Sequence, residues 1–262
     1  MSLTRHLVRL IRQKEVARSD LDWAALFVLD TLSCALGALR TEPARMLGAV
    51  APPESGDTAR RAFYLGGLSH ILEMDDLHRD SVTHPGCVVI PAAWAIAEER
   101  DLGGRAFLKA VLAGYEACCR VGMAVGKAHY RVWHNTSTCG PFGSALAAAD
   151  LIGLDEDQAV WALGNAGTQS SGLWQFLETG AMSKHLHTAR AAESGVLAAA
   201  LAADLELDVV VHGAPPLVLM LINVYHIDGH RCERMATCAR RSAAPRESRR
   251  SSAPRPRRSR RA

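Results

Sequence analysis

The spacing of apolar residues limits the possible folds of this chain more than any other feature. No segment before residue 207 alternates apolar and polar residues with the period of two that a half-buried β-strand requires. Apolar side chains instead recur every three or four residues, as at Leu3, Leu7 and Leu10. The chain is also rich in alanine and leucine and only 5% aromatic, which favours helices over strands. The sequence therefore predicts an all-α body.

The character of the sequence changes after this body. Residues 205–238 contain two apolar stretches broken by a Gly-Ala-Pro-Pro run, and they give no clear structural pattern. Residues 239–262 hold ten arginines and one glutamate among serine, proline and alanine. Such a composition cannot form a core, so we expect a disordered tail. We divide the chain into a helical domain (residues 1–204), an uncertain segment (205–238) and a disordered basic tail (239–262).

Charge and cysteine usage exclude several classes of protein. The tail carries a charge of +9 against +3 for the whole chain, so the body is mildly acidic and nucleic acid is not an expected partner. The seven cysteines form no CxxC pair, which indicates neither a disulfide framework nor a zinc ribbon.

The first residues lack a signal-peptide pattern. No window reaches the roughly 18 uncharged apolar residues of a spanning helix. We expect a cytoplasmic protein without a membrane association.

Titratable residues are densest between His70 and Pro91. This stretch ends in the apolar run Cys87 to Ile90, and charged groups beside such a run are costly to bury unless they satisfy one another or a ligand. We interpret it as the centre of a functional site. A divalent ion bound by its acids and histidines is one alternative, and a helix-capping role for one aspartate is another. The titratable residues in question are Glu73, Asp75, Asp76, His78, Arg79, Asp80 and His84.

Two later segments carry further candidates. His134 follows Trp133 in a polar loop before a helix start, which suits an acid or base held over a pocket, although a surface or capping histidine fits as well. Lys184 opens a helix, where the dipole disfavours a cation, so an anionic ligand is one explanation and a solvated lysine the other. His187 lies on the same helix face. His70 is interpreted as a structural or surface residue.

Four segments of the chain carry a resemblance to a known family: HILEMDDLHRDSVTHPG, WHNTSTCGPFGSALAAADLIGLD, GNAGTQSSGLWQFL and GAMSKHLHTARAAESGVLAAALAA. Together they resemble the MmgE/PrpD family, which includes 2-methylcitrate dehydratase, cis-aconitate decarboxylase and iminodisuccinate epimerase. The resemblance spans roughly residues 3 to 204 and implies a helical domain that dimerises, a smaller α/β lid, an active site between them and no metal or other cofactor. Glu73 and Leu77 depart from the common LDFDDT form, which we interpret as a difference in substrate class.

The resemblance also implies roles for single residues. It predicts a metal-independent lyase of the 2-methylcitrate dehydratase type, acting on a di- or tricarboxylate of propionate metabolism by histidine acid/base elimination. We assign substrate binding to Glu73, Arg79 and His187. The catalytic residues carried over by motif position are His134, His84, Asp75, Asp76 and Lys184.

The resemblance stops near residue 204, where the lid should begin. We therefore expect that the residues from about 205 onward arise from a reading-frame shift or a truncation, and that the chain has little dehydratase activity. The alternatives are a catalytically inactive helical dimerisation domain and a decarboxylase-like or epimerase activity.

Overall fold

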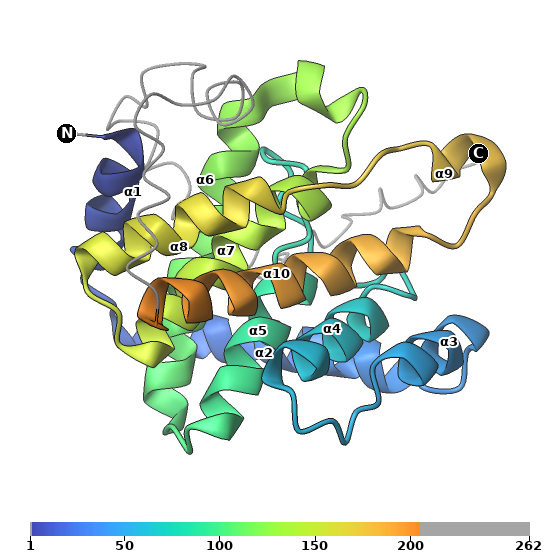
Figure 1. Cartoon of the computed structure of the whole chain (residues 1–262), viewed down its shortest axis with the longest axis horizontal. Coiled ribbons are helices and arrows are strands. Elements are labelled where there is room, and N and C mark those ends of the chain that lie inside the picture. The colour runs from blue at the N-terminus through green and yellow to red at the C-terminus, as the bar shows by residue number, and fades with distance from the viewer. Residues whose placement is uncertain (1, 205–262) are drawn as a thin grey trace, which may run out of the picture. The chain divides into compact units, whose positions relative to one another are not determined.

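The computed structural model describes residues 2–204, and this part of the chain is built from helices (Figure 1). No β-strand forms within it, and its isolated β-bridges join His78 to Thr83 and Trp133 to Leu173. The all-α prediction is therefore confirmed for the helical body. The segment 205–238, the basic tail 239–262 and the expected change of reading frame lie outside the described residues.

The helices begin where the sequence supplies capping groups. The carboxylate of Asp57 accepts hydrogen bonds from the backbone N–H groups of Ala59 and Arg60, and Asp155 forms a capping box with Gln158. These caps satisfy donors that the first turn of a helix leaves unpaired. The helices are α1 (Leu3–Arg12), α2 (Arg18–Ala38), α3 (Glu42–Val50), α4 (Thr58–Ser69), α5 (Gly86–Glu99), α6 (Gly104–Tyr130), α7 (Asn135–Ile152), α8 (Glu156–Thr168), α9 (Phe176–Thr179) and α10 (Lys184–Asp204).

Two helix boundaries differ from those expected from the sequence. We expected the fourth helix to run to Glu73, but α4 ends at Ser69 and His70 is its C-cap. We expected Pro91 to start the next helix, but α5 begins at Gly86 and contains Pro91. Pro85 explains the early start, because its ring already holds φ at −70° and its carbonyl accepts the N–H of Val89 at 2.9 Å.

Helix α7 lies at the centre of the packed core. Nearly all its residues are buried, and it contacts α5, α6, α8 and α10. Small residues make this possible: a Cβ atom placed on Gly143 of α7 would lie 2.7 Å from the carbonyl oxygen of Gly114 in α6. The backbones of the two helices therefore touch, and α7 presents its N-terminal end beside the loop that follows α4.

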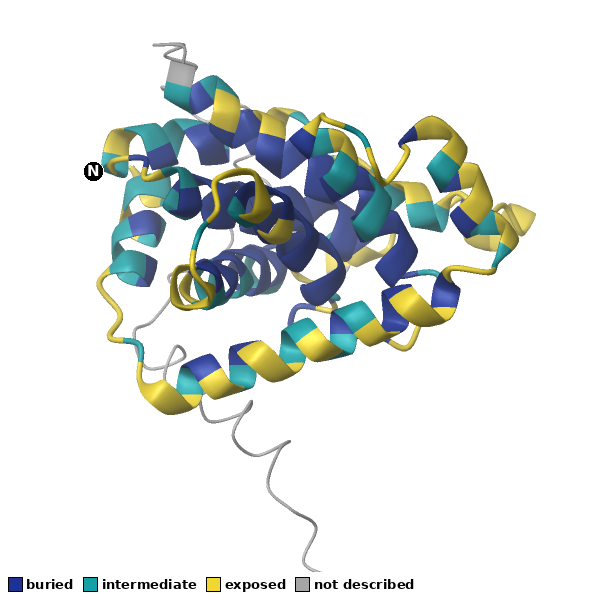
Figure 2. Cartoon of the chain, turned by 90° about the horizontal axis from the view of Figure 1, so that it is seen from below, coloured by how far each residue is buried: buried dark blue, intermediate teal, exposed yellow. Residues whose placement is uncertain are grey.

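Helix α2 is less buried than its sequence suggested. We expected it to be buried all round, yet Leu29 and Leu36 are 61% and 69% exposed on one side of the helix (Figure 2). Among the described helices, α2 is long and apolar enough to cross a membrane by length and composition. Only 33% of its most apolar 18-residue stretch is buried. Asp22 and Asp30 interrupt this stretch, so the expectation that no run of roughly 18 uncharged apolar residues occurs still holds. Because core helices and signal sequences pass the same test of length and composition, the result is weak evidence of a membrane span.

Candidate active site

Three helix ends and two loops bring the candidate residues together. His70 ends α4, His134 is the N-cap of α7, and Lys184 opens α10. The N–H of His134 donates to the carbonyl of Gly172, and the N–H of Trp174 donates to the carbonyl of Val132. These two bonds join the loop before α9 to the loop before α7, so residues distant in sequence face one another.

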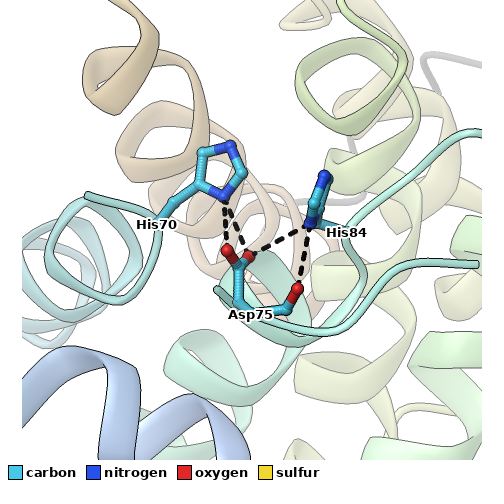
Figure 3. A group of neighbouring side chains, drawn as sticks. All are labelled: His70, Asp75 and His84. Atoms are coloured by element: carbon cyan, nitrogen blue, oxygen red, sulfur yellow. Dashed lines mark hydrogen bonds and ion pairs between the residues drawn. The ribbon is translucent and has the colours of Figure 1, made fainter. Parts of the chain in front are cut away.

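One group of the site consists of the buried His70 and Asp75 with the half-buried His84 (Figure 3). The Nδ1 atom of His70 lies 2.9 and 2.8 Å from the two carboxylate oxygens of Asp75. The Nδ1 atom of His84 lies 3.5 Å from Asp75 Oδ2 and 3.4 Å from the Asp75 carbonyl oxygen. Asp75 thus faces a histidine on each side.

Electrostatics keep Asp75 ionised in this setting. Burial alone would raise the pKa of Asp75, but the hydrogen bond from His70 and the electrostatic influence of the His70 and His84 rings outweigh it, so the pKa is lowered. An ionised carboxylate only accepts hydrogen bonds, so His70 carries the proton of that bond on Nδ1. Burial lowers the pKa of His84, and Asp75 opposes that effect only in part. His84 is therefore a neutral base near neutral pH.

A second histidine pair lies beside the first group. The Nδ1 atoms of His134 and His187 are 3.3 Å apart, and the rings of His134 and His70 are stacked with centroids 5.9 Å apart. Burial holds the pKa of His134 well below its usual range, and the charges of His70 and Lys184 add to this. Burial, followed by the charge of Lys184, lowers the pKa of His187 to about 4. Both rings are therefore neutral proton acceptors.

An aromatic wall covers this pair. The ring of Trp174 lies 4.8 Å from that of His134, and the ring of Phe176 lies 5.4 Å from that of His187, measured between centroids. Next to it is a cavity of about 400 Å³, which is large enough for a small organic acid. Its lining includes His187, Arg190, Ser183, Trp133, Phe176 and Leu186.

Lys184 stands at the edge of the site with Glu73 as its counter-ion. Its Nζ atom lies 2.5 Å from a carboxylate oxygen of Glu73, and Glu73 Oε1 lies 3.8 Å from His70 Nε2. Glu73 reaches this position from a left-handed backbone conformation, with φ at 55°, which is uncommon outside glycine. In this structure the anionic partner of Lys184 at the start of α10 is therefore the carboxylate of Glu73.

Two of the residues predicted for the site lie elsewhere. The carboxylate of Asp76 accepts a hydrogen bond from the backbone N–H of Gly86 at 2.9 Å, and the backbone N–H of Asp76 donates to the carboxylate of Asp30. Asp76 therefore stabilises the start of α5. Burial raises the pKa of Asp76 to about 7. Arg79 is exposed and forms no ion pair with another residue of the described range 2–204. Their proposed roles stay predictions.

His70 is the member of the site that the sequence did not single out. It is completely buried, although its neighbours in sequence mark it as part of an exposed, charged loop. The one available signal was its place five residues before Asp75, at the start of the charged stretch. Only the turn at Glu73 folds Asp75 back onto His70, and apolar spacing does not predict that turn.

The same buried group is the place where a metal ion would fit best among residues 2–204. One ligand atom each from His70, Asp75 and His84 lies within 4.8 Å of the others, and imidazole with carboxylate suits several divalent ions. In this structure, however, His70 and Asp75 satisfy each other by a hydrogen bond. The absence of a metal stays a prediction.

The group thus combines neutral histidines, an ionised aspartate and a lysine at its rim, which are side chains that general acid–base catalysis commonly uses. The MmgE/PrpD N-terminal domain model matches residues 8–205. This chain belongs to the MmgE/PrpD family, as its four motifs predicted.

Curated relatives give a finer comparison. The cis-aconitate decarboxylase-like protein oryM of Aspergillus oryzae is 35% identical over 148 residues, which is 53% of this chain and 30% of that protein. The cis-aconitate decarboxylase of Aspergillus terreus is 32% identical over 137 residues, 50% of this chain and 28% of that protein. The aligned part therefore covers less than a third of each of these relatives.

Proposed function

We propose that this domain carries the proton-transfer residues of a metal-independent lyase that acts on a small di- or tricarboxylate. The observation that carries the proposal is the group of neutral, buried histidines beside Lys184. His134 and His84 have pKa values lowered mainly by burial, so both are ready to accept a proton at neutral pH. The lysine supplies the positive charge that a substrate carboxylate needs.

In a dehydration, a histidine transfers the proton and Lys184 binds a carboxylate of the substrate. One histidine, His134 by preference, removes the proton from the carbon next to a carboxylate. The electron pair left by that proton forms the double bond, and the C–O bond to the leaving hydroxyl breaks. The proton that the histidine has taken is then passed to the departing hydroxyl, which leaves as water. Lys184 holds the carboxylate whose charge grows as the proton leaves.

Decarboxylation is the second candidate, and the names of the curated relatives favour it. The C–C bond to a carboxylate breaks, carbon dioxide leaves, and the electron pair takes a proton from a histidine that has first bound one from water. Both reactions build negative charge next to a carboxylate, so the same group of residues serves either one. The outcome depends on the substrate and on which histidine holds the proton.

Substrate assays distinguish these possibilities. The full chain is incubated with 2-methylcitrate and with cis-aconitate, and the products are followed by the absorbance of the new double bond and by released carbon dioxide. If the chain turns over either acid, His134→Ala should lower kcat far more than it raises KM, with His6→Ala as an exposed control. An unchanged kcat would remove His134 from the chemistry. Helical, folded protein without any turnover would instead favour the inactive dimerisation domain.

A further inference from the structure

His70 is the buried histidine that no role described above explains. Its side chain is inaccessible to solvent, and its Nδ1 atom donates to Asp75. Its other ring nitrogen, Nε2, is buried and has no hydrogen-bond partner among the described residues. Burying a polar ring with only one of its nitrogens satisfied is costly, so the bond to Asp75 is the interaction that holds His70 in place.

Asp75 is shared unequally between its two histidines. Its Oδ2 atom lies 2.8 Å from His70 Nδ1 but 3.5 Å from His84 Nδ1. The first distance is a charge-assisted hydrogen bond, whereas the second is a weaker contact that the Asp75 carbonyl oxygen supplements at 3.4 Å. Figure 3 shows the other nitrogen of His84 directed away from Asp75.

This unequal sharing has a consequence for His84. A carboxylate paired with one histidine alone stabilises the imidazolium form of that histidine. A carboxylate already engaged by a first histidine attracts the second one less, yet still orients its ring. His84 then keeps its proton on Nδ1 and offers a free lone pair on Nε2.

We infer that His70 is a positioning residue that engages the Asp75 carboxylate, so that Asp75 orients His84 without converting it to the imidazolium form. This inference rests on the proposed function only in so far as His84 acts as the base. The arrangement itself is a property of the folded chain without substrate.

Two substitutions at His70 separate the hydrogen bond from the packing. Asparagine offers an amide N–H close to the position of the histidine Nδ1, so His70→Asn keeps a donor for Asp75. Phenylalanine fills the space of the ring and has no donor. Because Nε2 has no hydrogen-bond partner, the Asp75 bond is the one hydrogen bond of the ring that His70→Phe removes, beside the longer 3.8 Å contact of Nε2 with Glu73. The same two substitutions at the exposed His6 serve as controls.

The measurement is the titration of His84, followed by ¹⁵N NMR of the histidine rings in the full chain without substrate. We expect the pKa of His84 to rise in His70→Phe, because Asp75 then faces His84 alone, and to stay close to the wild-type value in His70→Asn. The His6 variants should leave it unchanged. Equal His84 titration curves in the wild type and His70→Phe would overturn the inference.

A measurement on the wild type keeps the inference testable if His70→Phe does not fold. The ¹⁵N shifts of the rings should show both His70 and His84 protonated on Nδ1. A His70 ring protonated on Nε2 alone would overturn the inference. Neither experiment uses turnover, so a failed substrate assay would contradict the proposed function and leave this result standing.

Discussion

His134 and His187 accept protons less readily than histidines in water, because both rings are packed against aromatic side chains. The wall formed by Trp174 and Phe176 removes water from one side of the pair. Lys184 adds a positive charge that disfavours a second proton on either ring. At neutral pH the pair is therefore uncharged.

The stability of the domain should depend on pH through His187. The unfolded chain binds a proton at this residue near pH 6.5, whereas the folded chain does so only near pH 4. The unfolded state therefore binds more protons between these values, and the free energy of unfolding should fall as the pH drops through that window. Urea titrations above, within and below the window measure the fall, and His187→Gln should reduce it. His6→Gln should not. Identical pH profiles for the wild type and His187→Gln would contradict this.

Removal of divalent ions should leave the domain unchanged. His70 and Asp75 satisfy each other without an ion, so we expect the thermal unfolding midpoint to be the same before and after dialysis against a chelator. The measurement is thermal unfolding followed by circular dichroism. A drop in the midpoint that added zinc or magnesium restores would show that the buried group is a metal site.

At the scale of helices, the sequence predicted which segments are helical better than where they end. Apolar spacing located the body of α4, but the end at Ser69 depends on the turn at Glu73, which no periodic pattern marks. The sequence showed that α2 is apolar, but it did not predict that one side of the helix is exposed. Composition does not indicate whether a neighbouring element covers a helix. His70 was missed for a related reason: its partner Asp75 is set by the folded loop.

The contact between α6 and α7 should tolerate no added methyl group. A Cβ atom on Gly143 would lie 2.7 Å from the carbonyl oxygen of Gly114 and also 2.7 Å from the Cβ atom of Cys118. Gly143→Ala should therefore lower the free energy of unfolding by about 1–3 kcal/mol, the usual cost of overpacking a core. Gly104→Ala is the matched control, because a Cβ atom there meets nothing within 4 Å. Equal urea midpoints for the two variants would refute the close contact.

At the scale of the whole molecule, we propose a homodimer, and the exposed side of α2 is the surface that supports it best. Leu26, Leu29 and Leu36 lie on that side and are at least half exposed. Apolar rows of this kind are typical of surfaces that bind another protein. We expect light scattering to give a dimer mass at micromolar concentration and Leu29→Glu to give a monomer. Leu3→Glu, at an exposed leucine outside α2, should remain dimeric. A wild-type monomer would contradict the proposal.

The ion pair between Glu73 and Lys184 has a consequence for how the site meets its ligand. The lysine is already neutralised by a carboxylate of its own chain. A carboxylate substrate of the kind proposed would replace the Glu73 anion at the lysine with its own, so the total charge next to the histidines would hardly change during the exchange. Binding of this kind gains little from long-range attraction, so salt should weaken it less than it weakens capture by a bare cation. Selection among acids then depends on which carboxylate fits the lysine better than Glu73 does.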